Sequence, residues 1–392
     1  MINYSEAIEH IKQNPISLET ESISSEHGLN RILAEDIKAD RDYPPFNRSA
    51  MDGFAVNVEV YNILSKKSLV SQGKCFAGHA YSNSIDTSKV LKITTGAAVP
   101  EGLDAVIPIE LCDPSCDLIE FTPSTLTPYQ NIARKGEDLS TGEIILEKGT
   151  VLTPANLQAL ATVGCSTIEV IKLPKVALIT SGDEVKAIDE PILWNEIRNS
   201  NQWSIVASLK NLGIEPTLVT HVPDNKDLIS GTVKQALDSC DLILLTGGVS
   251  MGDVDFIPQV LQERGINKVF HKVAIKPGKP VWFGKNESQT VFGLPGNPLS
   301  SFHTFHLFVK PYLNFIASKK WDSESLLLTI GHDSKAGGID RFFPFQIKEG
   351  KAYVKPFNGS GDITASIESN GLILLEKDKS YTNGDLVSCW FY

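Results

Sequence analysis

Residues 176–184 read VALITSGDE, and this stretch decides the fold that we predict for the second half of the chain. Its first five residues form a short apolar strand, as a strand buried in a parallel sheet requires. The polar sequence Ser181-Gly182-Asp183-Glu184 ends that strand. From residue 174 onward, strand-like and helix-like runs alternate. This alternation predicts a doubly wound α/β domain over 174–320.

The other elements of this domain follow in the same order. A helix is predicted with Trp203, Val206 and Leu209 on one face, and Leu212 is a further candidate for that face. Strands are predicted over 217–220, 241–246 and 291–294, and helices over 228–237 and through Phe302, Phe305 and Phe308. Ligands of such domains bind at the carboxyl ends of the strands, so those ends are the first place to look for a site.

The rest of the chain predicts three further domains. Residues 1–45 read as mixed helix and short strand, whereas 46–139 are β-rich. Thr153 as N-cap, Pro154 at the first helical position and Gly164 beyond the end predict a helix. Residues 140–173 can therefore complete the N-terminal domain, with 46–139 as an insertion. Residues 321–392 predict a small β-barrel-like domain with a hairpin around Glu349-Gly350.

Composition is that of a soluble protein with several domains. The chain has 392 residues, 42% of them hydrophobic and 21% charged, which predicts two to four domains. The net charge of −11 argues against nucleic acid as a partner. No apolar run reaches the ~18–20 residues of a membrane span. The N-terminus lacks the features of a signal peptide and the six cysteines are scattered, so we expect a reduced, cytoplasmic protein.

Polar residues stand where the predicted strands end. Asp183 and Glu184 follow the first strand, Asp224 follows the second, and the glycine-rich run 246–255 follows the third. Segments 274–280, with Lys276 and Lys279, and 294–298 complete this edge. Glycine-rich turns present backbone amides to anions, and lysines add positive charge. Carboxylates beside an anion site suggest Mg²⁺ between them and a phosphate.

Several common sites are absent from the sequence or weakly supported. The chain has neither a GxxxxGK[ST] phosphate loop nor a GxGxxG dinucleotide motif. His303 and His306 have a spacing that metal ligands use, but no acidic or cysteine partner stands nearby in the sequence, so we expect them to pack within a helix. In the insertion, residues 47–55 read NRSAMDGFA, and a proline-led turn leaves Arg48 and Asp52 without a structural explanation.

Taken together, these motifs give the chain a resemblance to a known family. It resembles the MoeA-type molybdopterin molybdenumtransferases, the family that includes the E domain of gephyrin. Five regions carry the resemblance in family order: 45–55, 94–110, 181–184 with 196–201, 246–255, and 274–280 with 295–300. The resemblance implies that molybdate is inserted into adenylylated molybdopterin, with hydrolysis and release of AMP. It also implies a MoaB/MogA-like α/β domain and a homodimer with a site shared between subunits.

The same resemblance implies roles for individual residues. The implied catalytic residues are Asp52, Glu184, Asp224 and Asp255, and the last three are also candidate Mg²⁺ ligands. The implied contacts to the pterin nucleotide and the anion are Thr95, Ser181, Gly182, Gly247, Gly248, Ser250, Lys276, Lys279, Pro295, Gly296, Asn297, Pro298, Arg341 and Ser360. A molybdopterin adenylyltransferase and molybdoenzyme chaperones are expected partners. Asn199 departs from the family, where many members have aspartate.

Three other functions stay open on the sequence alone. A molybdopterin adenylyltransferase has a related α/β domain, but as a stand-alone domain with a TGGTG turn, where this chain has TGGVS at 246–250. A CinA-like nucleotide hydrolase shares the α/β domain but should lack the 48–55 segment. A non-catalytic scaffold is disfavoured because Asp52, both lysines and the carboxylates are retained. Tungstate in place of molybdate also stays open.

Overall fold

The computed structural model describes residues 1–392 except 114–117, 249–255, 319–320 and 322–324. The chain forms two compact units. The first comprises residues 1–35, 149–154 and 167–392, and the second comprises 36–148 and 155–166. The boundaries of the four predicted domains differ from those of the units, because the predicted N-terminal domain (1–45 and 140–173) has parts in both, and the four domains stay a prediction.

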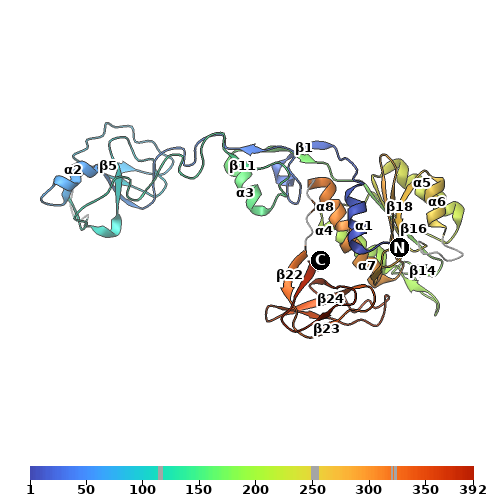
Figure 1. Ribbon diagram of the computed structural model, residues 1–392. Helices are drawn as coiled ribbons and strands as arrows, with labels where there is room; N and C mark the ends of the chain where they lie inside the picture. The colour runs from blue at the N-terminus through green and yellow to red at the C-terminus, as the bar shows by residue number, and fades with distance from the viewer. Residues whose placement is uncertain (114–117, 249–255, 319–320, 322–324) are drawn as a thin grey trace. The chain divides into compact units, whose positions relative to one another are not determined.

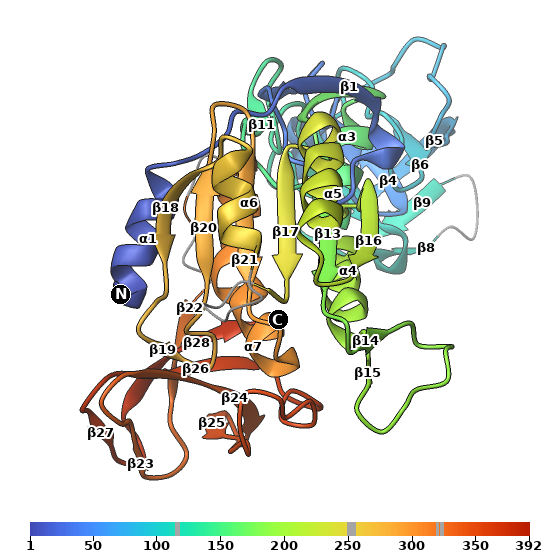
Figure 2. The same ribbon diagram turned by 90° about the vertical axis from the view of Figure 1, so that its right-hand side faces the viewer.

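A six-stranded sheet forms the centre of the first unit. Its strand order is β16-β13-β17-β21-β20-β18, and the first four strands are parallel (Figure 2). β20 runs antiparallel to both of its neighbours. The strands are β13 (Val176–Ser181), β16 (Leu218–Val222), β17 (Leu242–Thr246), β18 (Asn267–His271), β20 (Trp282–Lys285) and β21 (Thr290–Leu294). Every residue of β13, β17 and β21 is buried, which explains their largely apolar sequences.

Helices cover both faces of this sheet, so the predicted doubly wound arrangement is confirmed. Alternate residues of β17 point to opposite faces. Leu242 and Leu244 pack with the side that carries α1 (Tyr4–Lys12), α4 (Ser200–Asn211) and α8 (Lys310–Ser318). Ile243 and Leu245 pack with the side that carries α5 (Lys226–Ser239) and α6 (Ile257–Glu263).

The predicted buried face of α4 is partly wrong. Ile205 and Leu209 are the buried residues of the helix, and Val206 is only partly buried. Trp203, predicted on that face, is 58% exposed. Because positions three residues apart rotate away from one another around a helix, the run Trp203, Val206, Leu209 does not form a straight stripe. The pair at i and i+4 faces the sheet instead.

One nearly continuous helical stretch follows β21. It comprises α7 (Pro298–Thr304), a π-helical turn η3 (Phe305–Val309) and α8. His303 and His306 lie inside this stretch and are 0% and 7% exposed, so the predicted packing role is confirmed. His306 contacts the rings of Phe302 and Tyr392.

A second sheet in the first unit forms the C-terminal part of the chain. Its order is β19-β24-β26-β28-β22, with β25 paired to β24. The bridge between Ile330 and Ala352 brings the far end of the sheet back to β25, which gives the predicted barrel-like form. Glu349 and Gly350 have φ values of 49° and 76°, and they make the predicted hairpin turn. The strands of this sheet are β19 (Ile275–Lys276), β22 (Ser325–Thr329), β24 (Asp340–Lys348), β25 (Lys351–Val354), β26 (Gly371–Leu375) and β28 (Leu386–Phe391). A separate two-stranded sheet pairs β23 (Ser334–Lys335) with β27 (Ser380–Tyr381).

Short elements complete the first unit. β1 pairs with β12 in antiparallel register, and β14 pairs with β15 in parallel register. Their bounds are β1 (Thr20–Ser24), η1 (Ser25–His27), β12 (Thr167–Ile171), β14 (Val185–Lys186) and β15 (Ile197–Arg198).

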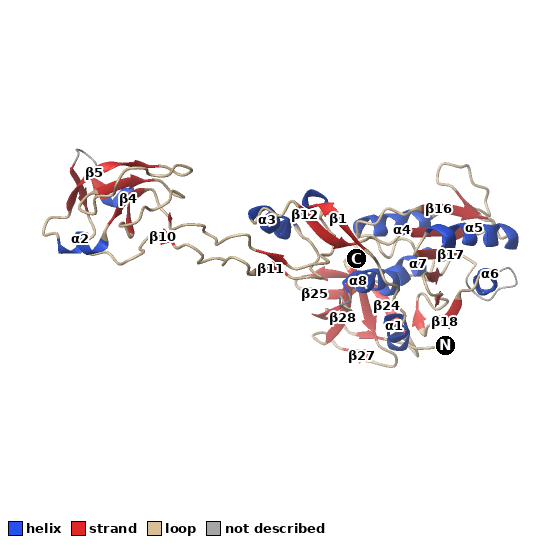
Figure 3. Cartoon of the chain, turned by 90° about the horizontal axis from the view of Figure 1, so that it is seen from above, coloured by secondary structure: helices blue, strands red, loops and turns tan. Residues whose placement is uncertain are grey.

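The second unit is mainly β-structure, as predicted for 46–139 (Figure 3). Its largest sheet has the order β7-β4-β6-β5-β9-β8 around a core that includes Phe54 and Phe121. The strands are β2 (Ile37–Lys38), β3 (Arg48–Ser49), β4 (Gly53–Val56), β5 (Ser68–Cys75), β6 (Val90–Ile93), β7 (Ala105–Pro108), β8 (Cys112–Asp113), β9 (Leu118–Phe121), β10 (Ile132–Ala133) and β11 (Ile144–Leu146). The helices are α2 (Val58–Ile63), η2 (Ile109–Leu111) and α3 (Pro154–Thr162), and α3 begins at the predicted proline.

Candidate functional site

A cavity of about 510 Å³ lies at the carboxyl ends of β13, β17 and β21 and beside the start of α4. We call it the glycine cavity. Its lining brings together ten of the residues predicted from sequence: Ser181, Gly182, Glu184, Asp224, Gly247, Gly248, Pro295, Gly296, Asn297 and Pro298. These residues come from four separate stretches of sequence. The topology of a parallel sheet brings them to one edge.

The glycines of this cavity are required by their backbone geometry. Gly247 and Gly248 have φ values of 91° and 57°. A Cβ atom on Gly247 would lie 2.4 Å from the carbonyl oxygen of Ser181. A side chain there would therefore push β13 and β17 apart at their ends. The Oγ atom of Ser181 is buried and has no hydrogen-bond partner among the described residues, so it is available to a ligand.

Asn201 holds two of the turns together, although the sequence analysis gave it no separate role. Its Nδ2 atom donates to Thr246 Oγ1 at 3.0 Å and to the carbonyl oxygen of Gly296 at 2.7 Å. Thr246 Oγ1 in turn donates to the carbonyl oxygen of Pro295 at 3.1 Å. The side chain of one residue in the first turn of α4 thus fixes the ends of β17 and β21.

A second polar network lies at the N-terminus of α4. Asn199 is 7% exposed and caps α4 by accepting from the backbone amide of Gln202. Asn199 Nδ2 donates to Thr180 Oγ1 at 2.8 Å, and Thr180 Oγ1 contacts His221 Nδ1 at 3.0 Å. An asparagine at 199 therefore serves as a buried donor and cap. The parallel register that pairs Thr180 with His221 builds this network, and no sequence signal reveals it.

Two carboxylates line the glycine cavity. Glu184 is exposed and Asp224 is half-buried, and the Asp224 amide donates to Asp183 Oδ1 at 3.0 Å. The described residues contain no group of three His, Cys, Asp or Glu side chains placed to hold a metal ion. Two carboxylates in one cavity still suit Mg²⁺, which commonly takes one or two protein carboxylates together with waters and substrate phosphates.

The predicted basic residues do not line this cavity. Lys276 and Lys279 are exposed, and the lining reaches only their neighbour Pro280. Lys276 pairs with Arg341 in the parallel ladder between β19 and β24. Two residues predicted to contact the anion therefore lie opposite each other on neighbouring strands. Ser360 Oγ accepts from Asn297 Nδ2 at 2.7 Å, which brings the C-terminal part to the rim of the cavity.

Asp52 and Thr95 belong to the second unit, and they contact each other. The backbone amide of Thr95 donates to Asp52 Oδ1 at 2.6 Å, and its hydroxyl group donates to the same atom at 3.0 Å. These hydrogen bonds lower the pKa of Asp52 below its usual value, and the bond from the backbone amide has the larger effect. The carboxylate is thus fixed in its charged form, on the surface of the unit. Ser250 and Asp255 lie outside the described residues.

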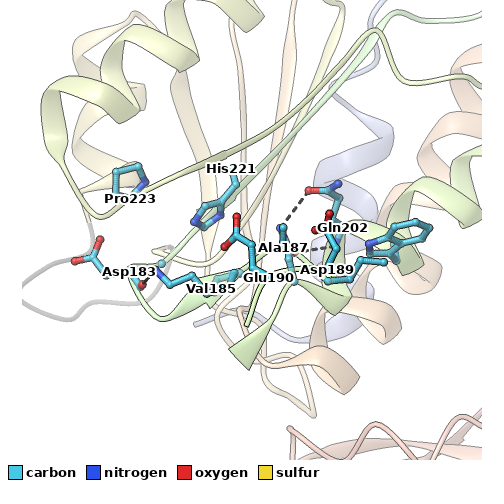
Figure 4. Close-up of a pocket in the computed structure, with 13 residues that line it drawn as sticks. Asp183, Val185, Ala187, Asp189, Glu190, Gln202, His221 and Pro223 are labelled. Carbon is cyan, nitrogen blue, oxygen red and sulfur yellow. Dashed lines mark hydrogen bonds between the residues drawn. The ribbon is translucent and has the colours of Figure 1, made fainter. Parts of the chain in front are cut away.

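A further cavity of about 630 Å³ shares a wall with the glycine cavity (Figure 4). Gly182, Val185 and Asn199 line both. The separate part of its lining includes Asp183, Asp189, Glu190, Gln202, Trp203 and His221. The sequence analysis named Asp183 at this edge but did not predict the cavity. We call it the acidic cavity.

The α/β domain has the fold of a molybdopterin-binding domain. Residues 177–314 match the family model described as "Probable molybdopterin binding domain". Residues 2–164 match the MoeA N-terminal region (domain I and II), and residues 334–392 match the MoeA C-terminal region (domain IV).

Full-length relatives identify the family. The chain is 34% identical over 378 residues to the molybdopterin molybdenumtransferase of Haemophilus influenzae, covering 94% of this chain and 93% of that protein. It is 33% identical over 369 residues to the Bacillus subtilis protein of the same name, covering 91% and 86%. The solved structure of the molybdopterin biosynthesis moeA protein from Pyrococcus horikoshii OT3 matches with a TM-score of 0.86 and 30% identity over both whole chains. This chain belongs to the MoeA family of molybdopterin molybdenumtransferases, the transferases of molybdenum cofactor biosynthesis.

The matches outside the α/β domain separate this family from the alternatives. A stand-alone adenylyltransferase and a CinA-like hydrolase share only the central domain, whereas this chain also matches the two flanking MoeA regions. The described residues contain no helix long and apolar enough to cross a membrane.

Proposed function

We propose that this chain inserts molybdate into adenylylated molybdopterin, with hydrolysis of the diphosphate bond and release of AMP and molybdenum cofactor. The observation that carries the proposal is the glycine cavity, where backbone amides, an unpartnered buried hydroxyl group and two carboxylates meet. Such a site suits a diphosphate held by amides. Membership of the MoeA family supports the same reaction.

Each group of residues has a proposed role in this reaction. The turn at Gly247 and Gly248 and the N-terminus of α4 bind the phosphates, because both present backbone amides to anions. Glu184 and Asp224 would hold Mg²⁺, with Asp255 as a third candidate ligand. When bound, Mg²⁺ would neutralise phosphate charge and polarise the bond that breaks. The oxygen of the attacking water ends on one phosphate, and the bridging oxygen stays with the other.

Molybdate is the second substrate, and basic residues bind it in this proposal. Lys276, Lys279 and Arg341 supply positive charge, and Ser360 supplies a hydroxyl group. Lys276 and Arg341 are suited to act together because they are paired in one ladder. Ser250 completes the set of contacts. The sequence does not decide between molybdate and tungstate.

The test is AMP release from adenylylated molybdopterin as a function of molybdate concentration. Lys279→Ala should raise the molybdate concentration required for half-maximal rate, and high salt should do the same in the wild type because it screens the charge. Lys234→Ala is the matched control, since Lys234 is an exposed lysine on α5, away from the strand ends. A molybdate response equal to that of the wild type in Lys279→Ala would remove this lysine from the site. Absence of AMP release by the wild type would overturn the proposed function.

We also propose that the protein acts as a cytoplasmic homodimer with four domains per chain, and that Asp52 and Thr95 complete the site of the partner subunit. Molybdopterin adenylyltransferase and molybdoenzyme chaperones are the proposed upstream and downstream partners. A mixture of Asp52→Ala and Lys279→Ala chains tests the shared site at a molybdate concentration too low for either variant alone to be active. After random exchange, half of the dimers are mixed and each has one intact site, so activity should recover to about a quarter of wild type. Verified exchange without recovery would mean that each site is built within one chain.

A further inference from the structure

The acidic cavity differs in chemistry from the glycine cavity beside it. Its lining carries the carboxylates of Asp183, Asp189 and Glu190 and the ring of Trp203, which is 58% exposed. Lys186 also lines it, but this ammonium group already contacts the Asp183 carbonyl oxygen at 3.0 Å and Glu196 at 3.5 Å. The cavity therefore presents mainly hydrogen-bond acceptors and negative charge. Such a lining repels phosphate groups.

The backbone of the loop that carries two of these carboxylates is held in place, and the carboxylates themselves have unused acceptor capacity. The loop that carries them is tied down by Arg198, whose Nε atom donates to the Ile188 carbonyl oxygen at 2.9 Å and whose NH2 atom donates to that of Glu190 at 3.4 Å. Among the described residues, no hydrogen bond or ion pair engages the side-chain carboxylate of Asp189 or Glu190. Figure 4 shows both residues at the same cavity as His221 and Gln202. Carboxylate acceptors on a tethered loop, beside an exposed indole ring, form a recognition surface for a flat ring with donor groups.

The substrate of the proposed function has two ring systems, one at each end of a diphosphate. The pyrimidine edge of a pterin places a ring N–H group next to an exocyclic amino group, so two adjacent donors face one carboxylate. The corresponding edge of adenine places an amino donor next to a ring nitrogen acceptor, which a carboxylate repels. The acceptor-rich lining therefore distinguishes the two ends of the molecule and favours the pterin.

We propose that the acidic cavity binds the pterin ring of the substrate, with Asp189 and Glu190 accepting hydrogen bonds from its donor edge and Trp203 stacking on its face. This inference rests on the proposed function. The diphosphate then lies across the shared wall at Gly182 and Asn199, in the glycine cavity. The pterin end of the substrate, rather than the adenine end, is thereby oriented toward the loop between β14 and β15.

Direct binding of a small pterin tests the inference without any turnover. The probe is 6-hydroxymethylpterin, which is neutral, carries no phosphate and is fluorescent. Asp189→Asn/Glu190→Gln should weaken its binding about tenfold or more, because charge-assisted hydrogen bonds are lost. Glu287→Gln, an exposed carboxylate at the opposite end of the sheet between β20 and β21, is the matched control and should bind like the wild type. AMP binding, measured in parallel, should be the same in all three proteins and verifies folding.

A pteridine with an oxo group in place of the 2-amino group provides the sharper readout. The wild type should bind this analogue, lumazine, about tenfold more weakly than the pterin, since a site built for a donor rejects a molecule that lacks it. The double variant should lose most of this preference, which a purely structural role of the two residues would not alter.

Three results would overturn the inference: a wild type that binds AMP but not 6-hydroxymethylpterin, a double variant that binds the pterin as tightly as the wild type, or an unchanged preference over lumazine in that variant. Failure of molybdate-dependent AMP release, with the pterin results as expected, would count against the proposed function alone.

Discussion

Acid should destabilise the first unit through the two buried histidines, His303 and His306. Burial lowers the pKa of each to about 3, and no ring nitrogen of either residue has a hydrogen-bond partner among the described residues. In the unfolded chain both titrate near pH 6.5. Between pH 6.5 and 3 the unfolded state therefore binds more protons, so the stability present above pH 6.5 is lost as the pH falls toward 3. At pH 5.0 the loss is about 2 kcal/mol for each residue, or about 4 kcal/mol for the pair.

Tryptophan fluorescence can follow this unit alone, because all five tryptophans of the chain lie within residues 167–392. Urea unfolding at pH 7.5 and pH 5.0 gives the change in the free energy of unfolding. In His303→Leu/His306→Leu that change should be about 4 kcal/mol smaller than in the wild type. His27→Leu is the matched control, because the side chain of His27 is 75% exposed and stays in contact with water. Equal pH dependence in the double variant and the wild type would refute the reasoning.

Three further predictions concern the candidate site. Gly247→Ala should lower the free energy of unfolding by about 1–3 kcal/mol and weaken AMP binding, since its Cβ atom would lie 2.4 Å from the Ser181 carbonyl oxygen; an unchanged urea midpoint would contradict this. Thr95→Val should raise the pKa of Asp52, because it removes a hydroxyl donor while keeping the backbone donor, and carboxyl-carbon NMR would detect the shift or its absence. Asn201→Asp should weaken AMP binding about tenfold by placing an acceptor against the Gly296 carbonyl oxygen, and equal dissociation constants would contradict it.

The sequence was sufficient to predict those strands and helices whose hydrophobic pattern matches their burial in the folded protein. The segments 176–179 and 242–245 are apolar throughout because they are buried on both faces, and that composition can be read without a structure. The position of Gly247 and Gly248 at the ligand-binding edge of the sheet was likewise predictable, because both residues directly follow an apolar strand. The family resemblance supplied residues such as Asp52, whose role no local pattern reveals.

Other features depend on three-dimensional contacts that the sequence does not display. Trp203 is apolar and stands at a plausible helical position, yet it borders a cavity instead of the core. Asn201 reads as an ordinary polar residue near the start of a helix, and only the positions of Thr246 and Gly296 reveal its bridging role. Glu190 and His221 line the same acidic cavity. His221 lies on β16, next to β13 in the sheet, and short sequence motifs do not show which strands are neighbours.

The two-residue strand β19 has a consequence for the order in which the protein is made. Ile275 and Lys276 pair with Asp340 and Arg341, which are synthesised 65 residues later. On the ribosome, the parallel sheet can close before this ladder exists, because its last strand ends at Leu294. Lys276 would then reach its final place only when the C-terminal strands have emerged. A nascent chain that is released early would carry a folded glycine cavity while Lys276 has not yet paired with Arg341.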